Sequence, residues 1–125
     1  MDHVDATRTL GSDGEDVACR HLRDQGLEVL ARNWRLASGE LRGELDVICR
    51  DGDALVVVEV KTRRSDAFGG PLFAVTPRKQ QKIRALTVAF MRQAGIHPRT
   101  IRFDVVAVWQ ARGTATRVEH VRDAF

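Results

Sequence analysis

Two acids and a lysine stand at unusual places in residues 43–63, GELDVICRDGDALVVVEVKTR. This segment has two apolar runs on either side of an Asp-Gly pair, which is the pattern of a β-hairpin. Asp46 interrupts the first run, and Glu59 and Lys61 stand at the end of the second. Burying a charge without a partner is costly, so valines would fold better at these positions. The three residues therefore raise the question of a shared chemical role.

The alternation of side chains along a strand predicts which residues of the hairpin share a face. With Asp51-Gly52 as the two-residue turn, Asp46 is expected opposite Val57, and Glu44 opposite Glu59. One face then carries the charged residues Glu44, Asp46, Glu59 and Lys61. The other face is apolar and suited to packing, with Leu45, Val47, Cys49, Val56, Val58 and Val60.

Asp46 and Glu59 are expected to be diagonal neighbours, roughly 7 Å apart at the backbone, so both carboxylates can reach one cation. Without a cation, clustered acids repel each other and their pKa values rise. Mg²⁺ suits such oxygen ligands and takes further ligands from water and substrate phosphate, beside which Lys61 would lie. Two plainer interpretations stay open: a salt-bridge ladder on an exposed sheet face, or a Glu59–Lys61 pair beyond the end of the strand.

Two helical residues are further candidates for the same site. Glu15 shares its helix face with the inward stripe Ala18, Cys19 and Leu22, so it either points into the acid cluster or forms a capping box with Ser12. Gln80 lies near the apolar stripe of a later helix and points either towards the sheet or to solvent.

Basic residues gather after the hairpin. Residues 1–60 hold 7 Lys/Arg and 13 Asp/Glu, a net charge of −6, whereas residues 61–125 hold 13 and 4, a net charge of +9. The basic half could attract DNA or RNA, or the two halves could be solvated faces of opposite sign. Six basic residues of this half are interpreted either as contacts to nucleic-acid phosphates or as ordinary surface charges: Arg63, Arg64, Arg78, Lys79, Lys82 and Arg84. Trp34 and Trp109 are scattered, so a base-stacking platform is not evident.

The order αβββαβ predicts an α/β protein with a single mixed β-sheet flanked by helices. The 125 residues are expected to form one domain, with residues 1–11 as a loose leader. The tail, residues 111–125, is expected either to add an edge strand or to contact a partner. The expected elements are a helix over 13–25, with Ser12 as N-cap and Gly26 as stop; strands over 27–34, 44–50 and 54–62; a loop over 63–75; a helix from Thr76 and Pro77 to Gly95; and a strand over 100–109.

Other chemistries find little support. No signal peptide is expected, and the sequence has no apolar stretch long enough to span a membrane and no GxSxG, P-loop or GxGxxG motif. Cys19 and Cys49 are isolated, which fits a reducing cytoplasm. The four histidines are interpreted as surface residues. Asp104, within a predicted strand, is expected to make a structural hydrogen bond or ion pair.

The chain resembles the YraN family of small bacterial proteins, which is similar to archaeal Holliday-junction resolvases and looks like a branch of the PD-(D/E)xK nuclease fold. The resemblance covers most of residues 14–108. The matching segments are GEDVACRHL, ARNWR, GELDVICRDGDALVVVEVKTR, FGGPLFAVTPRKQQKIRALTVAF and RFDVVAV. Two departures are Leu45 in place of the motif's proline and the longer connector LASGELRG.

The resemblance implies a restriction-endonuclease-like fold with a Mg²⁺ or Mn²⁺ site. Asp46 and Glu59, with the carbonyl of Val60, would hold the ion, and Lys61 would orient or deprotonate a water molecule. Glu15 would bind a second ion or a metal-bound water, and Gln80 would steady Lys61 or the water.

The leading hypothesis is a metal-dependent endonuclease that hydrolyses phosphodiesters in DNA, preferably in a branched or distorted duplex. Two active sites would be needed for symmetric resolution, so a homodimer is expected. The alternative is a module that binds nucleic acid, DNA or RNA, with the nuclease fold but little or no cleavage. A third interpretation takes the charged face as a surface for a protein partner.

Overall fold

The computed structural model describes residues 10–37, 39–64, 74–110, 113 and 115–125. Most of the predicted leader and of the predicted loop over 63–75 lies outside the described residues. The elements follow the order α1 (Leu10–Asp24), β1 (Glu28–Leu36), β2 (Gly43–Asp51), β3 (Ala54–Arg63), α2 (Pro77–Ala94), β4 (Thr100–Trp109) and β5 (Arg117–Val121).

The strands form one five-stranded sheet in the order β1-β2-β3-β4-β5. All neighbouring pairs are antiparallel except β3 and β4, which are parallel and are connected through α2. A parallel pair requires such a crossover, because a tight turn cannot return the chain to the same end of the sheet. The predicted mixed sheet flanked by helices is confirmed, and its arrangement is consistent with a restriction-endonuclease-like fold.

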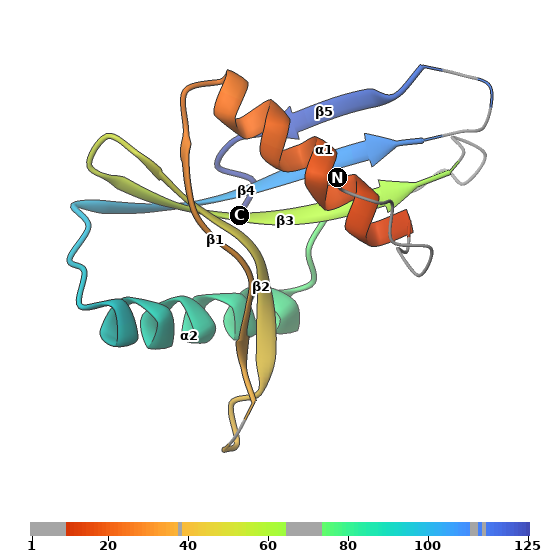
Figure 1. The fold of residues 1–125 in the computed structure, drawn as a ribbon. Coiled ribbons are helices and arrows are strands. Elements are labelled where there is room, and N and C mark those ends of the chain that lie inside the picture. The colour runs from red at the N-terminus through yellow and green to blue at the C-terminus, as the bar shows by residue number, and fades with distance from the viewer. Residues whose placement is uncertain (1–9, 38, 65–73, 111–112, 114) are drawn as a thin grey trace, which may run out of the picture.

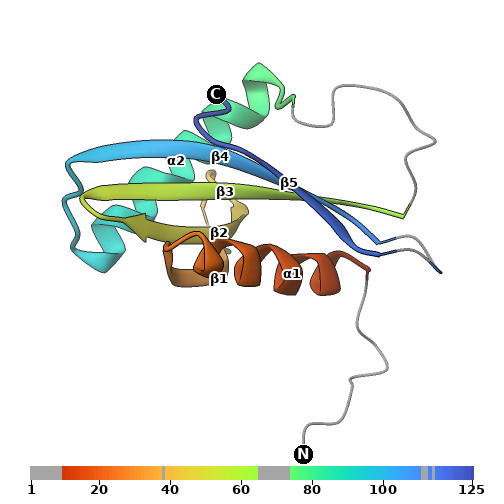
Figure 2. The same cartoon turned by 90° about the horizontal axis from the view of Figure 1, so that it is seen from above.

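The two helices cover opposite faces of the sheet (Figure 2), so the central strands are buried on both sides. Below α1, residues Ala18, Cys19 and Leu22 pack with Val47, Cys49, Val56, Val58, Val106 and Val108. Below α2, residues Ile83, Leu86 and Phe90 pack with Leu45, Ile48, Leu55, Val57, Phe103 and Val105.

Helix α2 begins and ends at its predicted signals. Thr76 is the N-cap, and its hydroxyl accepts a hydrogen bond from the backbone N–H of Lys79 at 3.1 Å. Pro77 is the first helical residue, and Gly95 ends the helix with a left-handed φ of 68°. The apolar stripe of this helix is buried at Ile83, Leu86, Thr87 and Phe90.

Helix α1 begins at Leu10, three residues before the predicted start. Ser12 therefore lies inside the helix, and the prediction that it is the N-cap is wrong, since serine is tolerated within a first turn as well as before it. The predicted stop is correct, because Gly26 has a left-handed φ of 90° and its N–H donates to the carbonyl of Arg23 at 2.9 Å. Near the start of the helix, Gly14 packs against Thr62 so closely that a Cβ atom would overlap the threonine side chain.

The hairpin turn is Gly52-Asp53 instead of Asp51-Gly52, because Asp51 pairs with Ala54. Gly52 has a φ of 60°, and a glycine with positive φ at the first central position is typical of a type II′ hairpin turn. The observed register places Val57 opposite Ile48, so the predicted pairing of Asp46 with Val57 is wrong. The shift is two residues, which leaves the alternation of faces unchanged.

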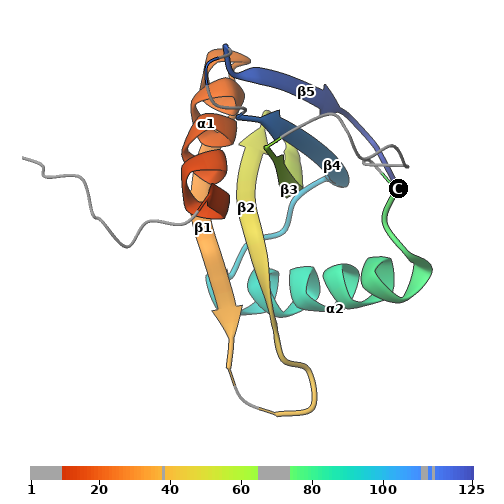
Figure 3. The ribbon, with the colours of Figure 1, turned by 90° about the vertical axis from the view of Figure 1, so that its right-hand side faces the viewer.

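Strands β2 and β3 separate at the predicted site. Their pairing begins at Val47 and Val58, whereas β2 continues to pair with β1 as far as Gly43. Figures 1 and 3 show β1 and β2 running together away from the rest of the sheet. This bend carries Leu45 to the α2 side of the sheet, so the prediction that Leu45 shares the face of Val47 is wrong.

The C-terminal tail adds the edge strand β5, which pairs antiparallel with β4 and makes the observed order αβββαββ. After β5, the backbone N–H of Ala124 donates to the carbonyl of Phe103 at 2.7 Å. Phe125 stacks on Phe103 with ring centroids 5.2 Å apart.

Candidate metal centre

Asp46 stands where β2 leaves β3, and its carboxylate joins the two strands. Its Oδ2 accepts a hydrogen bond from the backbone N–H of Val60 at 2.9 Å. A side-chain oxygen thus accepts from β3 directly beyond the last paired residues of the ladder, Val47 and Val58. One carboxylate oxygen is anchored in this way, which fixes the orientation of the acid.

Glu59 and Lys61 follow on β3, on the sheet face that α2 covers farther back. Their partners on β4 are Val105 and Ala107, and Val105 belongs to the core below α2. The Glu59 side chain is buried and the Lys61 side chain is about one-quarter exposed (27%), with Lys61 Nζ 4.0 Å from Glu59 Oε2. Asp46, Glu59 and Lys61 are thus brought to one place.

Two further acids approach Asp46. Among the described residues, one group of potential metal ligands gathers carboxylate oxygens of Glu15, Glu44 and Asp46 within 4.8 Å of one another. Glu15 comes from α1 and the other two from β2, so residues from a helix and a strand converge as the inward orientation of Glu15 predicts. A cluster of carboxylate oxygens is the ligand type that Mg²⁺ and Mn²⁺ prefer.

The pKa values of this cluster are raised. Burial, followed by the negative charge of Asp46, raises the pKa of Glu59 to about 7. Burial also raises the pKa of Asp46, although the hydrogen bond from Val60 acts in the opposite direction. The pKa of Glu15 is raised by burial and then by Asp46. Crowded acids that resist losing their protons fit a site where a cation supplies the missing positive charge.

Two lysines act against this rise. The positive charges of Lys79 and Lys61 lower the pKa values of Asp46 and Glu59, though less than burial raises them. Lys79 is in the first turn of α2, so the start of this helix faces the acid cluster. Lys82, one turn later, passes close to Gly43 at the start of β2.

The other predicted phosphate contacts lie in different surroundings. Arg63 and Arg64 are exposed at the end of β3, and Arg78 is exposed in the first turn of α2. Arg84 places its guanidinium over the rings of Phe103 at 4.8 Å and Phe125 at 5.6 Å, so it also has a packing role.

Gln80 makes a hydrogen bond to the segment that precedes α2. Its Nε2 donates to the backbone carbonyl of Val75 at 2.8 Å. This bond fixes the segment before the helix, and the role of Gln80 towards Lys61 or a water molecule stays a prediction.

Asn33 belongs to the site although nothing in the sequence singled it out. With its amide nitrogen turned towards the acids, it donates to both oxygens of Glu15, at 2.7 and 2.9 Å, and to Glu44 Oε1 at 2.8 Å. Its φ of 51° is left-handed, a conformation that asparagine tolerates better than most residues. The sequence shows only an asparagine within the segment ARNWR, with no spacing that connects it to the acids.

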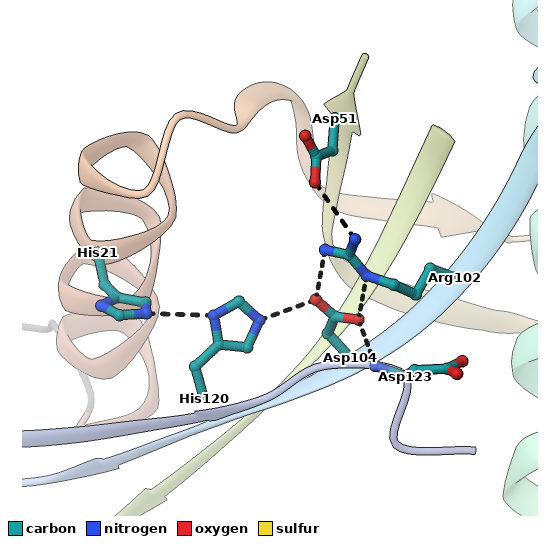
Figure 4. Close-up of polar contacts among 6 residues, drawn as sticks. All are labelled: His21, Asp51, Arg102, Asp104, His120 and Asp123. Atoms are coloured by element: carbon teal, nitrogen blue, oxygen red, sulfur yellow. Dashed lines mark hydrogen bonds and ion pairs between the residues drawn. The ribbon is translucent and has the colours of Figure 1, made fainter. Parts of the chain in front are cut away.

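A second polar network occupies the opposite face of the sheet, beside α1 (Figure 4). Asp104 is fully buried and accepts hydrogen bonds from Arg102 Nε at 2.8 Å, Arg102 Nη2 at 3.0 Å and the backbone N–H of Asp123 at 3.0 Å. His120 Nε2 lies 2.8 Å from the same carboxylate. Burial alone would raise the pKa of Asp104, but these hydrogen bonds, with the charge of Arg102, hold it at about 2. The predicted structural ion pair is confirmed.

This network corrects the interpretation of His21 and His120 as isolated surface residues, whereas His97 is exposed as predicted and His3 lies outside the described residues. His120 is nearly buried, and its Nδ1 lies 3.2 Å from Nε2 of His21 on α1. The two residues are 99 positions apart in the chain, so only the fold brings them together. They connect α1 to β5 and to Asp104 (Figure 4).

Helices long and apolar enough to span a bilayer are not found in the part of the chain that the structure describes.

Relatives of the chain share nearly its whole length. A UPF0102 protein of Kineococcus radiotolerans is 50% identical over 123 residues, covering 97% of each chain. A UPF0102 protein of Rhodococcus jostii is 49% identical over 116 residues, covering 93% of this chain and 95% of the relative. A UPF0102 protein of Geotalea daltonii is 42% identical over 118 residues, covering 94% and 90%.

The model of one protein family, "Uncharacterised protein family UPF0102", matches residues 14–108. This span is the one over which the sequence motifs resemble the YraN family. The chain therefore belongs to the uncharacterised protein family UPF0102, which is the YraN family.

Proposed function

We propose that this protein is a Mg²⁺- or Mn²⁺-dependent endonuclease that hydrolyses phosphodiester bonds in DNA. The observation that carries the proposal is the convergence of Asp46, Glu59 and Lys61, with Lys61 Nζ 4.0 Å from Glu59. Lys79 at the start of α2 supports it, because its positive charge lies beside the acids where a phosphate would enter.

In this proposal, Asp46, Glu59 and the carbonyl of Val60 hold the ion. When bound, the ion acts as a Lewis acid that lowers the pKa of a water molecule and polarises the phosphate. Asp46 is already oriented by the N–H of Val60, so little freedom is lost on binding. Glu15 would hold a second ion or the water beside the first.

Lys61 places a positive charge beside the phosphate that is attacked. The Lys61 side chain would orient the attacking water as an ammonium group or, as the neutral amine, would accept its proton, and Gln80 would steady this arrangement. Arg63, Arg64, Arg78, Lys79, Lys82 and Arg84 contact the phosphates of the nucleic-acid backbone, in DNA or in RNA, without reading sequence. We propose a branched or distorted duplex as the substrate and a homodimer, because cutting two strands symmetrically takes two active sites.

Cleavage of a plasmid and of a four-way junction, with Mg²⁺ or Mn²⁺ and with EDTA, tests the proposal. Wild-type protein should cut in a metal-dependent manner, whereas Asp46→Asn and Lys61→Met should not. Glu28→Gln is a matched control, because Glu28 is an acid paired with Arg50 at the surface. DNA binding without metal-dependent cutting of any substrate would contradict the proposal and favour a binding module.

Metal binding can be measured without a substrate. An ion that binds only the folded protein must raise its melting temperature. Millimolar Mn²⁺ should therefore stabilise the wild type and the Glu28→Gln control, but not Asp46→Asn. Equal shifts in all three would show that the ion binds elsewhere.

A further inference from the structure

A row of three residues crosses the sheet beyond the acid cluster. Arg63 on β3 is the register partner of Trp109 on β4, and Trp109 is the register partner of Arg117 on β5. Register partners on neighbouring strands project from the same face of a sheet. Residues far apart in the sequence therefore form one contiguous row, the Arg63–Trp109–Arg117 row.

This row lies on the face of the proposed active site. Lys61, two residues before Arg63, shares that face by alternation, and its own partner is Ala107. Two residues along a strand correspond to about 7 Å, so the row begins about 7 Å beyond the Lys61 row. A DNA strand whose phosphate reaches Lys61 would extend over it.

The row is accessible among the described residues. Figure 1 shows β3 and β4 running past the first turn of α2, which leaves the ends of these strands beyond the cover of that helix. Arg63 is exposed, the side chain of Arg117 is 51% exposed, and Trp109 is half-buried. The opposite face of the sheet is covered here by the start of α1, where Gly14 meets Thr62.

The chemistry of the row suits an unpaired nucleotide. The guanidinium of Arg117 lies over the Trp109 ring, 4.2 Å from its centroid, and is also 3.9 Å from Glu119. Bases stack both on indole rings and on guanidinium planes, so a base can extend this stack. In a duplex the base faces are already stacked on one another, and a duplex could use only the positive charges.

We propose that the Arg63–Trp109–Arg117 row binds unpaired nucleotides of a DNA strand beside the phosphate to be cleaved. Trp109 and Arg117 stack on a base, and Arg63 contacts a phosphate. The inference rests on the proposed action on DNA and specifies its substrate as duplex DNA with an adjoining single strand. The tryptophans are scattered in the sequence, so only the pairing of the strands makes a stacking platform visible.

Binding in EDTA tests this proposal without any cleavage. In a Trp34→Phe variant, Trp109 is the remaining tryptophan, and its emission should be quenched when oligothymidylate is added. Trp109→Leu should weaken binding of oligothymidylate about 5- to 150-fold, the range for loss of one stacked base, and leave binding of a blunt duplex nearly unchanged.

Variants of the two arginines separate stacking from charge. Arg117→Lys keeps the positive charge but loses the planar group, so it should weaken single-strand binding more than duplex binding. Arg63→Gln should lower the slope of log affinity against log salt by about 0.7 on a single strand, as expected for one lost phosphate contact. Arg99→Gln, an exposed arginine just before the opposite end of β4, is the matched control and should change neither.

Unchanged Trp109 emission, or equal losses on single strand and duplex, would overturn this inference. Metal-dependent cleavage together with either of those results would leave the nuclease proposal standing. A selective loss of single-strand binding in a protein that never cuts DNA would support the row and contradict the nuclease. Melting temperatures of all variants show whether each is folded.

Discussion

The backbone N–H of Val60 donates to the carboxylate of Asp46 at 2.9 Å, where strands β2 and β3 separate. The same acid therefore closes the end of a strand ladder and stands at the centre of the proposed metal site. Substitutions of Asp46 separate these two roles, because an amide keeps an oxygen acceptor and a methyl group does not.

We expect Asp46→Asn to fold as well as the wild type in EDTA and to lose the stabilisation by Mn²⁺. Asp46→Ala should in addition leave the N–H of Val60 without its acceptor, which costs about 1–3 kcal/mol. Urea denaturation in EDTA and in Mn²⁺ measures both effects. Equal stability of the two variants in EDTA would show that the hydrogen bond to Val60 contributes little.

The raised pKa of Glu59 predicts how stability depends on pH without metal. The ordinary pKa is 4.5, and burial and then Asp46 raise the pKa of Glu59 to about 7 in the folded protein. Between these values the folded state binds more protons than the unfolded state, so the free energy of unfolding falls as pH rises.

Glu59→Gln should therefore stabilise the metal-free protein at pH 8, on the order of 1–3 kcal/mol, with no gain near pH 4. The free energy of unfolding in EDTA, measured from pH 4 to pH 8 for the wild type and the variant, checks this prediction. A constant difference between the two proteins across this range would contradict it. Glu28→Gln should leave the pH profile unchanged.

The lowered pKa of Asp104 predicts that its contribution to the free energy of unfolding depends on pH in the opposite sense. Its pKa is lowered to about 2, because hydrogen bonds from His120, Arg102 and Asp123 outweigh its burial. Its contribution to stability is present above the ordinary pKa of 3.8 and is lost as pH falls towards 2. Asp104→Asn removes the buried one of the two acids that pair with Arg102, which keeps Asp51 at 3.2 Å, and should destabilise the protein by about 1–3 kcal/mol at pH 7.

The Asp104→Asn variant also tests whether this network is independent of the metal site. While still folded, it should be stabilised by Mn²⁺ as much as the wild type, because Asp104 lies on the opposite face of the sheet from Glu59. A lost Mn²⁺ response in the folded variant would show that the two networks are coupled.

The position of Asn33 between Glu15 and Glu44 predicts how an added negative charge there would change the stability of the protein. Its amide donates to both acids, and its left-handed backbone tolerates asparagine, aspartate and glycine. Asn33→Asp should lower the melting temperature in EDTA at pH 8, because one more carboxylate joins the cluster, and Mn²⁺ should recover much of the loss. Asn33→Gly, which keeps the backbone conformation, should lower it less. The reverse order in EDTA would show that Asn33 does not face the acids.

Local signals in the sequence were enough to predict most of the fold. Thr76, Pro77 and Gly95 define α2 through short-range capping and backbone preferences, and alternation placed Glu59 and Lys61 on one face. The hairpin register was wrong because either of two adjacent residue pairs around Gly52 can form the turn. In the observed turn Gly52 takes the first central position, where its positive φ is favourable.

The features that the sequence could not predict depend on contacts between distant residues. Asn33 bridges Glu15 and Glu44 only after β1 pairs with β2 and α1 packs above them. His21 and His120 meet because β5 joins the sheet beside α1. No periodicity or motif records such contacts, because neither partner needs a special neighbour in the chain.

Because Gly14 has no Cβ atom, α1 can pack closely against Thr62 on β3. Glu15 is the next residue, so the distance at which it stands from the other acids is set by how tightly this one turn can be seated. Any side chain at position 14 would act as a spacer, lifting the helix and drawing Glu15 back with it. The spacing within the acid cluster thus depends on Gly14, a residue that has no side chain and is not one of the acids.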